Sequence, residues 1–128
     1  MIAILSPAKT IDSKSRAAIS TNSMPAHIDM AETLVKGLKR LKPSELSKLM
    51  NISSNLAYLN HERFQLWDKN HQAGSAHQAI LSFKGDVYQG FDAESLEEED
   101  FKHAQNHLRI LSGLYGMLKP LDLIMPYR

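Results

Sequence analysis

Residues 46–59 read LSKLMNISSNLAYL. Apolar side chains recur in this stretch every three or four residues, which predicts two short helices joined by a tight hairpin. Ile52 stands between them and is expected to fill the corner. The first helix is expected to begin at Pro43, because proline is tolerated in the first turn of a helix but not in its interior, and to end near Met50. The inward-facing residues of the second helix are expected to be Leu56, Leu59 and Trp67.

The second helix of the hairpin is expected to begin at Ser53 or Ser54, because serine is a favourable N-cap residue. Backbone N–H groups at Ser53, Ser54 and Asn55, together with the helix dipole, would attract phosphate without reading bases. Lys48 and Arg63 could add positive charge. The pattern resembles the helix-hairpin-helix motif of DNA binders without sequence preference, although that motif normally has glycine in the hairpin. A plain helical hairpin buried in a core fits the pattern equally well.

The rest of the chain mixes strand and helix signals. They predict a short buried strand over 1–5, a polar loop over 11–26, a helix from His27 to about Leu41 and a loop over 68–78. A second strand is expected over 79–83; it is broken at Gly85, and Val87 and Tyr88 could continue it to Gly90. A helix with an apolar stripe is expected from Phe101 to Leu111. Ser95 and Glu98 form a capping-box pattern before the last helix, and Gly113 is expected to close that helix. The sequence therefore predicts an α+β fold with short strands and several helices.

Composition excludes several classes of protein. The chain has 128 residues, of which 43% are hydrophobic and 23% charged, so it suits one compact domain or part of a larger one and is not wholly disordered. It has no cysteine, so neither a disulfide framework nor a Cys-ligated metal site can form. No apolar stretch approaches the roughly 20 residues that a membrane span needs. We therefore expect a cytoplasmic protein that does not enter a membrane.

Positive charge is concentrated early in the chain, although the net charge is only +1. Residues 1–50 hold eight basic and four acidic side chains, whereas residues 51–128 hold seven basic and ten acidic ones. Six of those ten acids lie between Asp92 and Asp100. This distribution is compatible with a local basic face, but it excludes a uniformly basic nucleic-acid binder.

Two further features have both a functional and a structural interpretation. Lys9 follows the first predicted strand in the turn SPAKT, where it could hold an anion, but a solvated surface lysine fits equally well. His103 and His107 are one helical turn apart and could chelate a metal, yet no third ligand is specified. The sequence therefore favours a solvated helix edge there, and we expect neither a metal site nor a cofactor. Direct ligation of iron is disfavoured for the same reason and because cysteine is absent.

Three motifs occur in a characteristic order: SPAKT at 6–10, FKGDVY followed by Gly90, and HLR-x-LSGLYG-x-LKPLD at 107–122. PYR at 126–128 matches the start of a further motif. Together these motifs resemble the YaaA family along the whole chain. The resemblance implies a cytoplasmic bacterial protein of the peroxide stress response that helps limit free intracellular iron. It also implies an unusual mixed α/β fold that binds double-stranded DNA through a basic cleft containing a helix-hairpin-helix element.

The resemblance adds basic residues within the motifs to the candidate DNA contacts. The full set of expected contacts is Lys9, Lys48, Ser53, Ser54, Asn55, Arg63, Lys84, Arg109, Lys119 and Arg128. Because these groups would contact phosphates, affinity is expected to come mainly from counterion release, with little sequence preference. No catalytic residue is assigned, and the sequence favours a binding protein over an enzyme.

Family members are longer than this chain, which therefore resembles an N-terminal half and is expected to form one incomplete domain over 1–128. The apolar residues from Leu121 to Met125 fit a packing partner in the missing C-terminal half, so an inactive fragment is one alternative. Another is an enzyme acting on a nucleotide or nucleic-acid base. In that case Lys9, Asp86 and Asp122 would supply charge and proton transfer. Tyr88 or Tyr115 would lie beside them. In the DNA-binding interpretation the two tyrosines could stack on bases, but a half-buried tyrosine with a satisfied hydroxyl is the commoner case.

Overall fold

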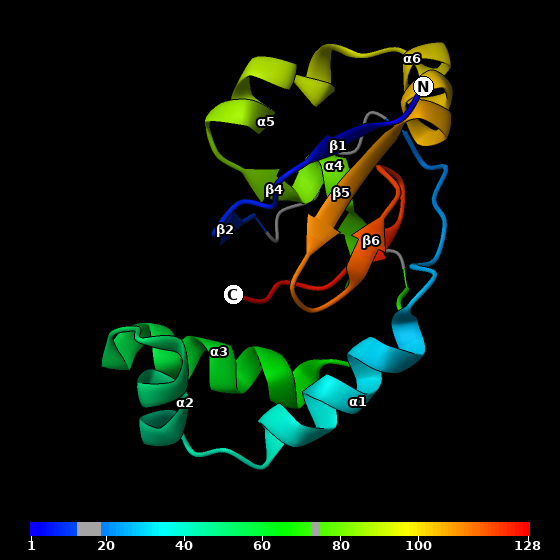
Figure 1. Ribbon diagram of the computed structural model, residues 1–128. Helices are drawn as coiled ribbons and strands as arrows, with labels where there is room; N and C mark the ends of the chain where they lie inside the picture. Colours follow the sequence, from blue (N-terminus) through cyan, green and yellow to red (C-terminus); the bar gives the residue numbers. More distant parts are fainter. Residues whose placement is uncertain (13–18, 73–74) are drawn as a thin grey trace.

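The computed structural model describes residues 1–12, 19–72 and 75–128, and it confirms a mixed α+β fold (Figure 1). The elements in chain order are β1 (Ala3–Leu5), β2 (Thr10–Ile11), α1 (Ile28–Lys39), α2 (Pro43–Met50), α3 (Ser54–Leu66), β3 (His77–Gln78), α4 (Ala79–Ser82), β4 (Phe83–Lys84), α5 (Asp86–Phe91), the 3-10 helix η1 (Ala93–Ser95), α6 (Glu98–His107), β5 (Leu108–Ser112), β6 (Gly116–Leu118) and β7 (Leu123–Ile124). Figure 1 shows α1, α2 and α3 grouped on one side of the strands, with α5 and α6 at the opposite end.

The largest sheet has the strand order β1-β5-β6. β1 runs parallel to β5, and β5 runs antiparallel to β6. The register pairs Ile4 with Arg109, and Leu111 with Met117. Because side chains alternate across a strand, these four residues share one face, and Ile110, which is fully buried, lies on the other. Two smaller antiparallel pairs, β2–β4 and β3–β7, connect this sheet to the intervening segments.

The hairpin and the helix before it form largely as predicted. α1 ends shortly before Pro43, and its Ala31 and Val35 are buried. Of the residues predicted to face inward from α3, Trp67 is buried and Leu56 is half-buried, but Leu59 is 40% exposed. The buried residues of this helix are instead Ala57, Asn60 and Phe64.

Residues 79–90 form two short helices and not the predicted strand. α4 is buried on every side, and a short apolar run of this kind cannot be distinguished from a strand by its pattern. Only the two residues of β4 pair with a neighbouring strand. The chain enters α5 after Gly85, so Tyr88 lies on a helix.

The helix predicted to extend to Leu111 ends at His107, and the next five residues form β5. Burial alternates along β5, as expected for a strand with one covered face. β1 supplies its hydrogen-bonding partner, so tertiary pairing overrides the helical spacing of the apolar residues. Gly113 therefore follows a strand and is not a helix cap.

The start of α6 also lies two residues later than predicted. The backbone N–H of Glu97 donates to the Asp100 carboxylate at 2.9 Å, which completes a capping box. Ser95 Oγ instead donates to the carbonyl of Asp92 at 2.8 Å. The acidic run contains several carboxylates that could take the capping role predicted for Glu98. In the structure Asp100 takes this role.

The two predicted loops contain short pieces of strand. The loop over 11–26 begins within β2, and Ser23 forms an isolated bridge with Asp122. Residues 13–18 of that prediction lie outside the described residues. The loop over 68–78 ends in β3, and its residues 73–74 also lie outside the described part of the chain.

A buried hydrogen-bond cluster around the Tyr115 hydroxyl joins α3, the following loop and the end of the chain. Trp67 Nε1 donates to this hydroxyl at 2.8 Å, and the backbone N–H of Met125 donates at 2.9 Å. His71 Nε2 lies 2.7 Å from the same oxygen, and His71 Nδ1 lies 2.6 Å from the carbonyl of Asp68. Nδ1 must carry a proton to donate to that carbonyl, so a neutral His71 accepts the Tyr115 proton at Nε2.

This burial excludes the proposed stacking of Tyr115 on bases, because the side chain has no exposed surface. Tyr88 is also buried, and its hydroxyl donates to the carbonyl of Ser6 at 2.5 Å. Burial raises the pKa of Tyr88 to about 12. Both tyrosines therefore contribute to packing within the described structure.

We expect the stability of the protein to fall in mild acid because of His71. Burial lowers the pKa of His71 below its ordinary value of 6.5, so the unfolded chain binds the proton more tightly than the folded one. The free energy of unfolding should therefore decrease as the pH falls below 6.5 and continue to decrease until the folded-state pKa is passed. Urea unfolding followed by Trp67 fluorescence at several pH values measures this dependence.

His71→Gln should remove this part of the pH dependence, whereas the matched change His103→Gln should keep it, because His103 is exposed. Identical pH profiles for His71→Gln and the unchanged protein would show that His71 does not cause the effect.

Candidate nucleic-acid interface

The hairpin between α2 and α3 is a three-residue turn. Asn51 ends α2 with φ 52° and ψ 54°, in the left-handed region. Glycine adopts this conformation most readily, but asparagine is among the residues that tolerate it. Ser53 is extended and forms the N-cap of α3, as predicted. The hairpin therefore forms without glycine, because Asn51 takes the conformation for which glycine is usually needed.

Hydrogen bonds to Ser47 fix the corner of the hairpin. The backbone N–H groups of Asn51 and Ile52 both donate to the Ser47 carbonyl. Ser47 Oγ donates in turn to the Ile52 carbonyl at 2.7 Å. The Ile52 side chain packs against the core, which confirms its predicted role at the corner. This turn holds the start of α3 in a defined position.

The start of α3 is exposed to solvent. Ser53 Oγ accepts a hydrogen bond from the Leu56 N–H at 3.3 Å, and Ser53, Ser54 and Asn55 are all exposed. Helix geometry leaves the N–H groups of Ser54 and Asn55 without a carbonyl partner inside the helix. These two amides and the positive end of the helix dipole are therefore available to an anion such as a phosphate group.

The two basic residues predicted beside the hairpin lie at different distances from it. Lys48 is exposed in the last turn of α2, next to the turn itself. Arg63 lies in the last turn of α3, about 14 Å along the helix axis from Ser54. Burial lowers the pKa of the Arg63 guanidinium. We define the hairpin tip as Lys48, Ser53, Ser54 and Asn55, and Arg63 is not part of it.

A second group of predicted residues surrounds the turn after β1. Lys9 and Lys84 line a cavity of about 350 Å³ together with Asp86. Lys84 is placed there by the pairing of β4 with β2. Lys9 also lines a larger groove, as does the exposed Arg128. The structure therefore brings three predicted cations near one loop, with a carboxylate among them.

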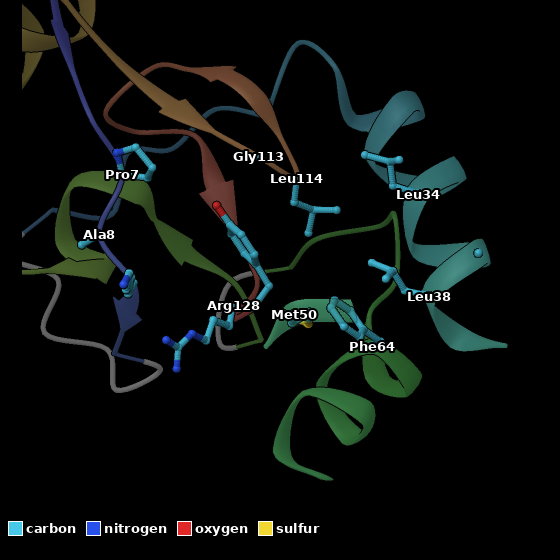
Figure 2. Close-up of a pocket in the computed structure, with 12 residues that line it drawn as sticks. Pro7, Ala8, Leu34, Leu38, Met50, Phe64, Gly113, Leu114 and Arg128 are labelled. Atoms are coloured by element: carbon cyan, nitrogen blue, oxygen red, sulfur yellow. The ribbon is translucent and has the colours of Figure 1, made fainter. Parts of the chain in front are cut away.

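The larger groove has a volume of about 720 Å³ and is mostly apolar (Figure 2). Leu34 and Leu38 from α1 face Leu114 across it, and Phe64 and Met50 extend the helical wall. Such a lining is unsuited to a phosphodiester, because a buried charge needs compensating polar contacts. Sequence reasoning missed the groove, although the wide apolar stripe of α1, which includes Leu34, indicated more than one packing contact.

The remaining predicted cations lie elsewhere. The Arg109 guanidinium donates to the carbonyls of Gln105 at 2.9 Å and Leu108 at 2.7 Å. Lys119 is exposed and follows β6. Burial raises the pKa of Asp122, and the charges of Lys119 and Arg109 act against that rise. These two cations therefore belong to the surroundings of Asp122 and do not line the groove.

The histidine pair on α6 stacks locally. The rings of His103 and His107 are 4.2 Å apart, and His107 Nδ1 lies 2.9 Å from the His103 carbonyl. In residues 1–12, 19–72 and 75–128, no group of three or more His, Asp or Glu side chains is placed to hold a metal ion.

None of the helices in the described ranges is both long enough and apolar enough to cross a membrane.

Comparison with known proteins places the chain in a family. The family model described as peroxide stress protein YaaA matches residues 1–128. The chain belongs to the YaaA family. Relatives with 48% identity over 128 residues include UPF0246 proteins of Burkholderia cenocepacia (strain HI2424), Burkholderia lata and Burkholderia vietnamiensis. Each match covers the whole of this chain and 49% of the relative, so the chain spans about half the length of these curated YaaA-family relatives.

Proposed function

We propose that this chain binds double-stranded DNA through phosphate contacts at the hairpin tip, as part of a cytoplasmic response to peroxide stress. The observation that carries the proposal is the exposed, serine-capped start of α3 beside Lys48. Membership of the YaaA family supports the link to peroxide stress. The DNA contacts are inferred from the geometry of the tip.

In this proposal the amides of Ser54 and Asn55 hold phosphate oxygens, and Lys48 supplies a mobile charge beside them. Such contacts read no bases, so binding is tolerant of sequence. Lys9, Lys84 and Arg128 are the next candidates, because they surround one loop and could meet a neighbouring stretch of backbone. Arg63, Arg109 and Lys119 lie outside both groups and have less support from the geometry.

We expect Lys48→Ala to reduce the salt dependence of DNA binding. Each phosphate neutralised by a cation contributes about 0.9 to the slope of log K against log salt, so the slope should fall by about 1. Fluorescence anisotropy with a labelled random duplex between low and physiological salt measures this slope.

Lys102→Ala is a matched control, because Lys102 is exposed on α6 and pairs with Glu98 and Glu99. An equal reduction for both variants would indicate a general effect of net charge, and an affinity independent of salt would contradict phosphate binding altogether.

We propose that the chain limits free iron through DNA binding and not by ligating iron itself. The chain has no cysteine thiolate to offer to iron. Within the described residues, the stacked His103–His107 pair is not part of a group of three or more His, Asp or Glu side chains that could hold a metal ion. A titration of the chain alone with ferrous iron should therefore show no saturable binding, and saturable binding in the absence of DNA would contradict this part of the proposal.

An enzyme acting on a nucleotide or base is a second candidate function, because Lys9 and Asp86 line the same cavity. Asp122 does not line that cavity, and Tyr115 is buried in the hydrogen-bond cluster. Of the three charged groups proposed for an enzyme, only Lys9 and Asp86 therefore lie in the cavity. Asp86→Asn distinguishes the functions: it should abolish turnover in an enzyme, whereas removal of a negative charge should leave DNA binding unchanged or stronger.

A further inference from the structure

The outer face of the largest sheet carries exposed apolar side chains around the partly buried Arg109. β1 was expected to be buried, yet Ile4 is 57% exposed, and Leu111 and Met117 are 43% and 46% exposed. The strand register places these three side chains on one face. Ile2, which precedes β1, is 51% exposed. On the opposite face, Ile110 and Leu118 have no exposed surface. The sheet therefore packs on one face only.

An open sheet face that carries several apolar side chains is unusual. All-parallel sheets are almost always covered on both faces, and sheets with antiparallel strands usually place polar side chains on an open face. β1 is also at the edge of the strand order, where unpaired backbone groups favour pairing with another segment. Contiguous exposed apolar residues commonly mark an interaction surface.

The groove of Figure 2 begins where the same two parallel strands end. Pro7 and Ala8 follow β1, and Gly113 and Leu114 follow β5, and all four line the groove. Figure 1 shows the end of the chain between the sheet and the helical layer, and Arg128 lines the groove. β1 and β5 therefore lead from the open sheet face to the edge of the groove. The apolar residues Leu121, Leu123 and Ile124, which were expected to fit a partner in the missing half, are instead buried within this chain.

We propose that this face and this groove form one docking surface for the second half of the family domain, the half of the relatives' length that lies outside the match. Three observations favour that occupant: the relatives contain about as much chain again, Arg128 is at the groove, and the lining is apolar. An apolar side chain of the second half would enter between α1 and Leu114. Others would cover Ile4, Leu111 and Met117.

The docking surface leaves the hairpin tip free, although Lys9 and Arg128 line the groove and would lie beside the second half. Met50 lines the groove at its helical end, but none of the tip residues does. The second half can therefore complete the core while Ser54 and Asn55 still face solvent. The inference goes beyond the proposed DNA binding, and its test does not use DNA.

The absence of cysteine allows single-thiol probes to test this proposal. Gly37→Cys on α1 and Gly113→Cys after β5 place thiols at the groove, and Gly90→Cys on α5 is a matched control outside it. All three positions have open space where the Cβ would be. Each variant would be prepared alone and fused to the second half of the Burkholderia cenocepacia relative, with every cysteine of that half replaced by serine, and its reaction with Ellman's reagent would be timed.

In the chain alone, all three thiols should react readily. In the fused protein, the rates at Gly37→Cys and Gly113→Cys should fall by about tenfold or more, because access limits thiol reactivity, while Gly90→Cys is unchanged. Unchanged rates at both groove positions would overturn the proposal and indicate a groove left open for a small ligand. Equal protection at Gly90→Cys would overturn it as well, because shielding would then be general.

Met117→Lys provides a second measurement for the sheet face. Because Met117 is half exposed in this chain, the substitution should change its urea midpoint little. In the fused protein the lysine would be buried without a partner, so the midpoint should fall clearly. An equal change in both proteins would overturn the proposal for this face.

Discussion

Asn55→Asp should weaken the binding of random duplex DNA by on the order of tenfold, which corresponds to about 1.4 kcal/mol, while leaving the fold intact. Asn55 occupies the second position of α3, where its backbone N–H has no helical partner. A carboxylate there favours the helix dipole, so helix stability is retained or slightly raised. The same carboxylate lies where a phosphate would have to approach, so it repels the ligand. Gel retardation at low salt and thermal unfolding measure the two effects separately.

Ser44→Asp is the matched control for this substitution. Ser44 occupies the second position of α2, it is exposed, and its replacement changes the net charge by the same amount. It lies at the end of α2 away from the hairpin tip. We therefore expect Ser44→Asp to reduce DNA binding only slightly. Equal losses for the two variants would mean that overall charge, and not the start of α3, determines binding.

Tyr115→Phe should lower the free energy of unfolding by about 3 kcal/mol or more. The substitution keeps the ring but removes the hydroxyl that accepts hydrogen bonds from Trp67 Nε1 and the Met125 N–H and donates one to His71 Nε2. Each polar group left buried without a partner costs about 1–3 kcal/mol. Trp67 is the single tryptophan of the chain and belongs to the cluster, so its fluorescence reports urea unfolding directly.

Two other Tyr→Phe substitutions serve as comparisons for the effect of Tyr115→Phe on the free energy of unfolding. Tyr58 is 63% exposed, so Tyr58→Phe should change stability by less than about 0.5 kcal/mol. Tyr88→Phe removes one hydrogen bond to the Ser6 carbonyl and should cost about 1 kcal/mol. If Tyr115→Phe were no more destabilising than Tyr58→Phe, the described hydrogen-bond cluster would not contribute to stability.

Features determined by neighbouring residues could be predicted from the sequence. Pro43 begins a helix and Ser53 caps the next one because proline geometry and serine capping act within a single turn. β5 could not be predicted in this way. Its apolar spacing fits a helix, and only the parallel partner β1, about a hundred residues earlier in the chain, makes it a strand.

The same distinction between local and long-range structure applies to the candidate site. The hairpin tip is a local structure, and the sequence placed Ser53, Ser54 and Asn55 at the start of α3 as the structure has them. The grouping of Lys9 with Lys84 and Arg128 depends on strand pairing across the chain. Counting charges along the sequence therefore could not distinguish these three cations from Arg109 and Lys119. Burial of Tyr115 depends equally on distant segments, so the sequence left both base stacking and packing open for this residue.

The most direct test of phosphate binding at the hairpin tip follows the backbone amide signals by NMR during titration with a short random duplex at low salt. The amides of Ser54 and Asn55 should shift most and saturate together, whereas the Ser44 amide at the equivalent position of α2 should barely move. If the Ser54 and Asn55 amides stayed unshifted while DNA bound, the start of α3 would not be the phosphate site.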